Sequence, residues 1–157
     1  MELVIFINLT LLVMIAFFLQ SKRLHILENI FLYMMLVFFL TGYMGILYVN
    51  VGSWKVSSSI DLFIIFRLYE FIMSPLLYLA FFNLFEKMDT KMKKFIVFIA
   101  FVAIISSAQF LLVKWEVITF MDWHIILSSI TIVMMILVMY VALLLFRKVL
   151  RREGIRE

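Results

Sequence analysis

Several residue types on which active sites depend are absent or scarce in this 157-residue sequence. There is no cysteine, which excludes disulfide bonds, thiolate metal sites and thiol nucleophiles. Proline occurs once and glycine four times. We find no glycine-rich phosphate loop, no nucleophile elbow and no paired histidines at metal-binding spacing. The sequence therefore predicts that the chain is not an enzyme and holds no cofactor or metal.

Charge is scarce as well, whereas long apolar runs are abundant. The chain is 67% apolar and 15% charged, but soluble domains are about half apolar and a quarter charged. A membrane-spanning helix needs roughly 20 apolar residues. Five stretches have about this length, at residues 3–19, 30–51, 62–85, 95–113 and 125–146. We predict an all-α integral membrane protein whose residues 1–157 form one five-helix bundle, with a short basic tail at 147–157.

The first stretch could be mistaken for a secretory signal peptide. It begins with the acidic residue Glu2 instead of a basic region, and no small-x-small cleavage site follows it. We expect a retained helix.

The few charges alternate between the ends of the predicted helices. Eleven of the 14 Lys and Arg residues follow the first, third and fifth stretches, where five acidic residues leave a net charge of +6. The opposite ends hold two basic and four acidic residues, a net charge of −2. Because cytoplasmic loops are enriched in Lys and Arg, we predict an outside N-terminus and an inside C-terminus.

The two loops predicted to lie outside hold all three tryptophans, Trp54, Trp115 and Trp123. Tryptophan favours the membrane interface, where its ring stays in lipid while its N–H meets water. We expect residues 115–123 to lie flat on the outer leaflet as one or two helical turns. Residues 52–59 have the composition of a flexible turn.

One group of polar residues inside the third stretch is a candidate functional site. On a regular helix, four polar residues fall within an arc of about 80°: Arg67, Glu70, Ser74 and Tyr78. Pro75, the only proline, cannot donate a backbone hydrogen bond, and its ring clashes with the Phe71 carbonyl. We predict a helix kink at Pro75 and a polar intramembrane site beside it.

Two interpretations of this site remain open. In the first, Arg67 holds an anionic group or neutralises Glu70, Glu70 takes up a proton or cation, and Ser74 and Tyr78 complete the hydrogen bonds. In the second, the ion pair is structural and fixes the register of the bundle. Charged residues inside a membrane are usually functional, but charges that are paired within one helix are the mildest cases.

Small residues mark two faces suited to close helix packing. One face, on the second stretch, contains Thr41, Gly45 and Tyr48, and the other, on the fourth, contains Ala100, Ala103 and Ser107. The sequence leaves open whether these faces meet each other or a partner chain. The remaining polar residues receive modest roles: Glu28 as a helix cap, Asn83 at another contact or the inner interface, and the basic tail as a contact for phosphates.

These features predict a lipid bilayer with anionic inner head groups as one partner, a membrane protein or a second copy as another, and no nucleic acid. The first functional hypothesis is an accessory or scaffold subunit of a membrane complex. The alternative is a small transport or ligand-sensing protein with its site around Arg67 and Glu70. The composition resembles that of short multi-pass proteins of low-GC Gram-positive bacteria, which implies a bacterial cytoplasmic membrane and no residue roles.

Overall fold

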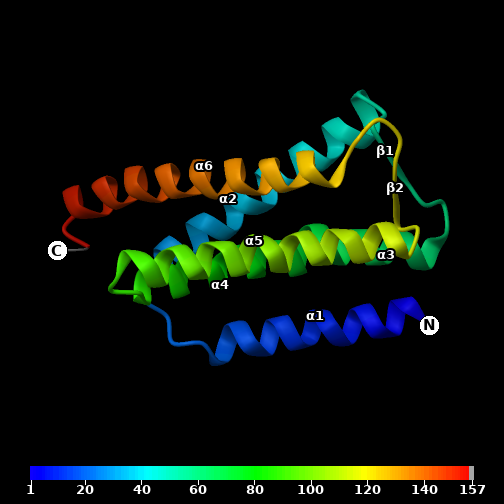
Figure 1. Ribbon diagram of the computed structural model, residues 1–157. Coiled ribbons are helices and arrows are strands. Elements are labelled where there is room, and N and C mark those ends of the chain that lie inside the picture. Colours follow the sequence, from blue (N-terminus) through cyan, green and yellow to red (C-terminus); the bar gives the residue numbers. More distant parts are fainter. Residues whose placement is uncertain (156–157) are drawn as a thin grey trace.

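The computed structural model describes residues 1–155 and consists of five long helices (Figure 1). Two of these helices contain a wide turn, labelled η, in which the backbone hydrogen bonds skip one extra residue. The elements are α1 (Glu2–Leu19), α2 (Ile26–Gly45), η1 (Ile46–Asn50), β1 (Trp54–Val56), α3 (Ile60–Leu68), η2 (Tyr69–Met73), α4 (Ser74–Lys87), α5 (Lys91–Lys114), β2 (Ile118–Phe120) and α6 (Ile125–Arg152). The prediction of five helices long and apolar enough to cross a membrane is confirmed.

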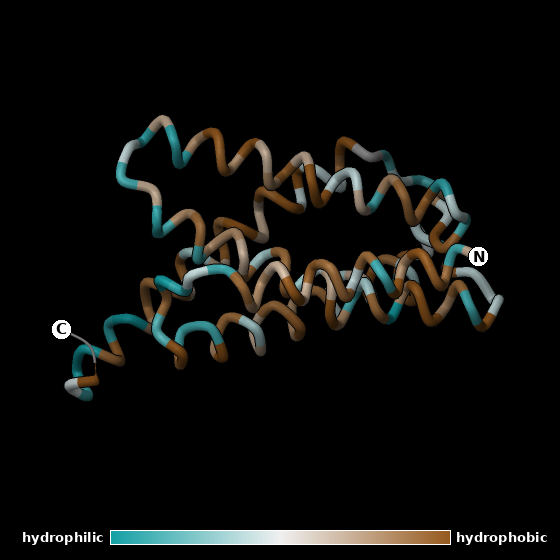
Figure 2. The backbone as a smooth tube through the Cα atoms, turned by 90° about the horizontal axis from the view of Figure 1, so that it is seen from below, coloured by the Kyte–Doolittle hydropathy of each residue, from teal (hydrophilic) through white to brown (hydrophobic). Residues whose placement is uncertain are grey.

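The two ends of the bundle differ in what they carry. The N-terminus and the two short strands lie at one end, which we call the sheet end (Figure 1). The α1–α2 turn, the α4–α5 turn and the C-terminal part of α6 lie at the other, the basic end. Figure 2 shows hydrophobic residues along most of the helices and hydrophilic residues gathered in the turns and near the C-terminus.

The continuous helix α3–η2–α4 is the centre of the bundle. In its most apolar stretch of 18 residues, 56% of the residues are buried, compared with at most 28% in the corresponding stretches of the other four helices. Helices α1, α2 and α5 pack directly against it, and α6 packs against α5 and α2. The buried core is correspondingly dense in large side chains from this helix, among them Phe66, Tyr69, Tyr78, Phe81 and Phe82.

The loops at the sheet end differ from our expectation. Strands β1 and β2 pair antiparallel, with Trp54 opposite Phe120 and Val56 opposite Ile118. We had predicted turns of helix at residues 115–123 and a flexible turn at 52–59, and both predictions are wrong. The predicted all-α class is corrected to a helical bundle with one small sheet. Pairing satisfies backbone N–H and C=O groups that an isolated loop would leave open.

Trp54 packs inside the protein, whereas we expected its ring to lie in lipid. Its side chain is only 2% exposed, and its ring packs edge-on against Tyr43 and Trp123 and at a tilt against Phe120. The strand pairing turns this ring inward, where it closes the sheet end of the core. Trp123 keeps a polar contact, because its Nε1 donates to the Ser128 hydroxyl at 2.9 Å.

At the basic end, Asn83 of α4 holds the α1–α2 turn in place. Its side-chain oxygen accepts from the backbone N–H groups of Arg23 and Leu24, at 3.0 and 3.2 Å. Its side-chain nitrogen donates to the Asn29 side chain at 2.7 Å and to the Leu79 carbonyl at 3.0 Å. Asn83 is fully buried, and all four of its hydrogen-bonding positions are used.

Arg147 of α6 joins three helices at the same end. Its Nε donates to Glu28 Oε1 of α2 and its Nη1 donates to Glu86 Oε1 of α4, both at 2.9 Å. Glu28 is fully buried. It also caps α2 as expected, because its Oε2 accepts from the His25 backbone N–H at 2.9 Å. Arg147, which we had expected to contact phosphates with the rest of the tail, instead forms an internal ion-pair cluster.

We predict that Arg147→Gln lowers the free energy of unfolding in mild detergent by about 3 kcal/mol, because a buried carboxylate loses its charged partner. Arg151→Gln is the matched control, since Arg151 is exposed on the next turn of α6 and should change the free energy by less than about 0.5 kcal/mol. Unfolding by denaturant titration, followed through helicity, measures both. Equal effects of the two variants would show that the ion-pair cluster stabilises the protein no more than an exposed arginine does.

Candidate functional site

Arg67 and Glu70 form the ion pair that their spacing suggested. Arg67 Nη1 lies 2.6 Å from Glu70 Oε2. The two side chains differ in environment, because the Glu70 side chain is 1% exposed and that of Arg67 is 35% exposed. The guanidinium also lies over the rings of Phe63 and Phe66, which lowers the cost of its partial burial.

The second carboxylate oxygen of Glu70, Oε1, is buried and has no hydrogen-bond partner within the described residues. A carboxylate oxygen in this state lacks the stabilisation that water or a donor would provide. Both partners of the ion pair belong to the same helix, so the pair itself does not link two helices. Its geometry thus leaves one acceptor free for a further group.

The wide turn η2 divides the polar stripe that the sequence predicted. A turn of this kind adds one residue, so positions after it rotate by about 100° relative to a regular helix. Arg67 precedes the turn and Glu70 lies near its start, whereas Ser74 and Tyr78 follow it. The structure therefore brings Arg67 and Glu70 together, and places Ser74 and Tyr78 in a pocket that neither charged residue lines.

Pro75 gives the physical reason for this irregularity. It stands at the start of α4, directly after η2, and the Ser74 N–H bonds to the Tyr69 carbonyl five residues back. The Phe71 carbonyl, four residues before Pro75, accepts instead from the Tyr33 hydroxyl of α2 at 3.0 Å. The carbonyl that Pro75 frees is thus satisfied by a neighbouring helix.

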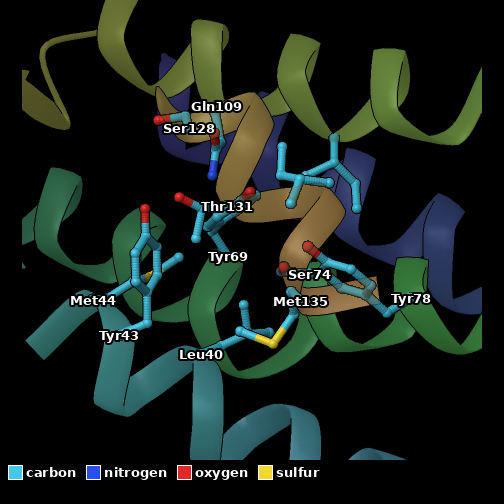
Figure 3. Close-up of a pocket in the computed structure, with 12 residues that line it drawn as sticks. Leu40, Tyr43, Met44, Tyr69, Ser74, Tyr78, Gln109, Ser128, Thr131 and Met135 are labelled. Carbon is cyan, nitrogen blue, oxygen red and sulfur yellow. The ribbon is translucent and has the colours of Figure 1, made fainter. Parts of the chain in front are cut away.

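Ser74 and Tyr78 belong to a pocket in the middle of the bundle, between α2, η2, α4, α5 and α6 (Figure 3). Figure 3 shows polar groups from different helices directed toward one another around it. The polar side chains that line the pocket are Tyr43, Tyr69, Ser74, Tyr78, Gln109, Ser128 and Thr131. None of these side chains is charged.

Three of these side chains have a polar atom without a partner. The hydroxyls of Tyr43 and Tyr69 and the Oε1 atom of Gln109 are buried, and no hydrogen bond reaches them within residues 1–155. Ser74 and Gln109 are the polar neighbours of the Tyr69 hydroxyl, but neither meets hydrogen-bond geometry with it. Thr131 is the corresponding polar neighbour of the Tyr43 hydroxyl.

The size of the pocket limits what it can hold. The space open to the centre of a water molecule is about 10 Å³, close to the minimum that one water requires. The pocket therefore has room for about one water, which would find unpaired polar atoms in its lining, and it is too small for an organic solute.

Sequence reasoning identified Ser74 and Tyr78 but missed the other pocket residues. Gln109 was the available signal, because it is the one amide side chain in the apolar stretch 95–113. Tyr43 and Tyr69 could not be assigned from the sequence, since tyrosine is equally common as an interfacial residue. Within residues 1–155, no three His, Asp or Glu side chains come together as metal ligands.

The two small-residue faces do not meet each other. Ala100, Ala103 and Ser107 lie on the exposed side of α5, and the Ser107 hydroxyl donates to the Ala103 carbonyl of its own helix at 2.8 Å. On α2, a Cβ added at Gly45 would meet no atom within 4 Å. Thr41 and Tyr48 are half-buried. The α5 face therefore looks away from the core, whereas the α2 face lies at its edge, with Tyr48 against the buried Phe66 ring.

Comparison with known protein families, curated proteins and solved structures finds no match to this chain.

We predict that Gln109→Leu lowers the free energy of unfolding by about 1–3 kcal/mol. A pocket that holds a bridging water would lose an acceptor, and the two tyrosine hydroxyls would remain buried with fewer partners. Ser107→Ala, on the exposed side of the same helix, should change it by less than about 0.5 kcal/mol. If Gln109→Leu instead stabilises the protein, the pocket is dry and leucine simply fills it.

Proposed function

We propose that this chain is an accessory or scaffold subunit of a membrane complex, inserted through its five helices in a cell membrane, in our interpretation the cytoplasmic membrane of a bacterium. In this proposal the basic end faces the cytoplasm and the N-terminus lies outside. The charge pattern supports this orientation, because Lys and Arg are enriched in cytoplasmic loops. The arrangement of the two ends (Figure 1) fits it.

A groove on the outer face of α2 carries the proposal. It has a volume of about 620 Å³ and lies between α2 and η2, where its walls include Tyr33, Val37, Phe38 and Phe71. Thr41 and Gly42 line it as well. The Thr41 hydroxyl is buried and has no hydrogen-bond partner within the described residues.

In a membrane, such a groove suits a helix from another protein. Small residues let two helix backbones approach closely, and hydroxyl groups form hydrogen bonds between helices. The Thr41 hydroxyl is buried beneath the groove, so its side chain would have to turn outward to meet a partner's polar group, which lipid tails do not supply. Gly42 would provide the close approach, because a Cβ added there meets no atom of this chain within 4 Å.

The interior supports the same proposal. A transporter of organic solutes needs a path through the bundle, and the central pocket admits about one water. The space that could receive a larger partner lies on the outside of the helices. The exposed small-residue face of α5, with Ala103 at its centre, offers a second surface for packing against other helices.

We predict that Gly42→Leu abolishes recovery of the partner when the tagged protein is isolated from native membranes in mild detergent. The added side chain fills the groove without touching the rest of the chain, and replacing glycine in a helix favours folding. Helicity and the elution volume of the purified variant should therefore match those of the wild type.

Gly45→Leu is the matched control, because Gly45 has equally open surroundings but does not line the groove. Loss of the partner with Gly42→Leu alone assigns docking to the groove. Loss with both variants assigns it to the wider α2 face. Wild-type protein that is recovered alone contradicts the accessory function.

Glu70 favours transport or ligand sensing as a second candidate function. It is a fully buried carboxylate with one oxygen held by Arg67 and the other free of partners within residues 1–155. Ionisable groups within a membrane commonly mark proton or ion pathways. Here a proton or a small cation would bind at Oε1, while Arg67 would remain accessible from the surface of the bundle.

If the second candidate is correct, protein reconstituted in vesicles should carry a proton flux that a pH-sensitive dye detects. Glu70→Gln should abolish this flux with little effect on helicity, since the amide keeps the shape and loses the titrating group. A structural pair predicts no flux in any variant and a stable Arg67→Leu, Glu70→Leu double variant, because buried ion pairs can often be replaced by apolar residues.

A further inference from the structure

A second cavity lies at the basic end, between α1 and α2, with α4 as its floor. Its volume is about 430 Å³, which falls in the range of sites for small organic molecules. Phe17 and Phe18 form the α1 wall, Ile30 lies in the α2 wall, and Leu76 and Leu79 form the floor. The cavity is an apolar crevice, about 40 times larger than the central pocket by the same measure.

Lys22 stands at the polar side of this crevice. Its ammonium group turns back over the Phe17 ring, 3.3 Å from the ring centroid, and donates to the Phe17 carbonyl. Desolvation lowers the pKa of this ammonium from its ordinary value. No carboxylate forms a salt bridge with Lys22 or with the neighbouring Arg23 in the described part of the chain. An anion beside these two residues would therefore gain a favourable interaction.

The turn that carries these two cations is held in a fixed conformation. Buried Asn83 accepts from the backbone N–H groups of Arg23 and Leu24. At the end of α1, the Gln20 side chain donates to the Ala80 carbonyl of α4 at 3.1 Å. Both anchors use groups other than the Lys22 and Arg23 side chains. Lys22 lines the crevice, Arg23 is its neighbour in the chain, and both residues are exposed. A ligand anion would take the place of the Phe17 carbonyl as the acceptor for the Lys22 ammonium.

We propose that this crevice binds one anionic phospholipid, with an acyl chain between α1 and α2 and its phosphate against Lys22 and Arg23. The apolar walls match the hydrocarbon chain, and the adjacent cations match the head group. Basic residues near a membrane surface attract anionic head groups. In the proposed orientation the site faces the cytoplasmic leaflet, where basic segments meet anionic lipids.

The surroundings argue for lipid over a partner helix at this position. The crevice is bounded by a hydrogen-bonded turn and by two aromatic rings of α1, and its one charged lining residue is a cation. Small residues, which a close helix contact requires, are absent from its lining. This distinguishes the crevice from the groove beside Gly42, so the lipid site and the accessory function can fail independently.

The test uses the purified full-length protein in mild detergent, titrated with phosphatidylglycerol or with phosphatidylcholine of the same acyl chains. Native mass spectrometry counts the bound lipids. We expect one phosphatidylglycerol to bind about tenfold more tightly than phosphatidylcholine. Inorganic phosphate at the same concentration should not displace it, because the acyl chain contributes to binding.

Two variants separate the head-group contact from the acyl-chain contact. Lys22→Gln combined with Arg23→Gln should remove the preference for phosphatidylglycerol and leave phosphatidylcholine binding unchanged. Ile30→Trp, at a position that is 52% exposed, should fill the crevice and reduce the binding of both lipids.

Each variant has a control at a matched position. Lys91→Gln with Lys93→Gln removes two exposed cations of the same end, outside the crevice. Val141→Trp enlarges a side chain of α6 that is 55% exposed. Both controls should keep wild-type binding. If the Lys91 and Lys93 control loses the preference equally, or if Ile30→Trp binds both lipids normally, the proposal is wrong.

Discussion

The wide turn η2 before Pro75 is the constraint on which the arrangement of the bundle depends. The helix that contains it is the most buried of the five and contacts α1, α2 and α5. Because proline lacks an N–H and its ring crowds the carbonyl four residues back, the backbone widens and Tyr33 supplies the missing donor. Pro75 thus sets both the rotation of α4 and a hydrogen bond between α2 and η2.

That rotation determines which polar groups meet. Without η2, Ser74 and Tyr78 would continue the stripe of Arg67 and Glu70. With it, they face Tyr43 of α2 and Gln109 of α5 around the central pocket. The charged pair and the neutral pocket become separate features, so the chain has two polar places where the sequence predicted one. A bridging water suits the neutral pocket, because seven uncharged side chains offer donors and acceptors but no counter-charge.

Much of the architecture could be predicted, because it follows from local properties of the chain. The number of helices follows from the length of the apolar runs, and the position of the basic end follows from the charges between them. Both properties can be read from one segment at a time. The β1–β2 sheet and the Arg147 cluster could not be predicted in this way. Residues 54–56 and 118–120 are too short to indicate strands alone, and Arg147 meets Glu28 across 119 positions. Such contacts depend on how distant segments come together.

The polar atoms that remain unpaired distinguish the surfaces of the bundle from its interior. A buried unpaired donor or acceptor costs about 1–3 kcal/mol, a cost that a small protein can bear at few sites. The central pocket has room for a water beside its unpaired atoms. The Thr41 hydroxyl is different, since it borders an outer groove where lipid offers no hydrogen bond. A partner helix with a polar residue would satisfy it once the Thr41 side chain turned toward the groove, whereas lipid would not, and this difference supports the proposed accessory function.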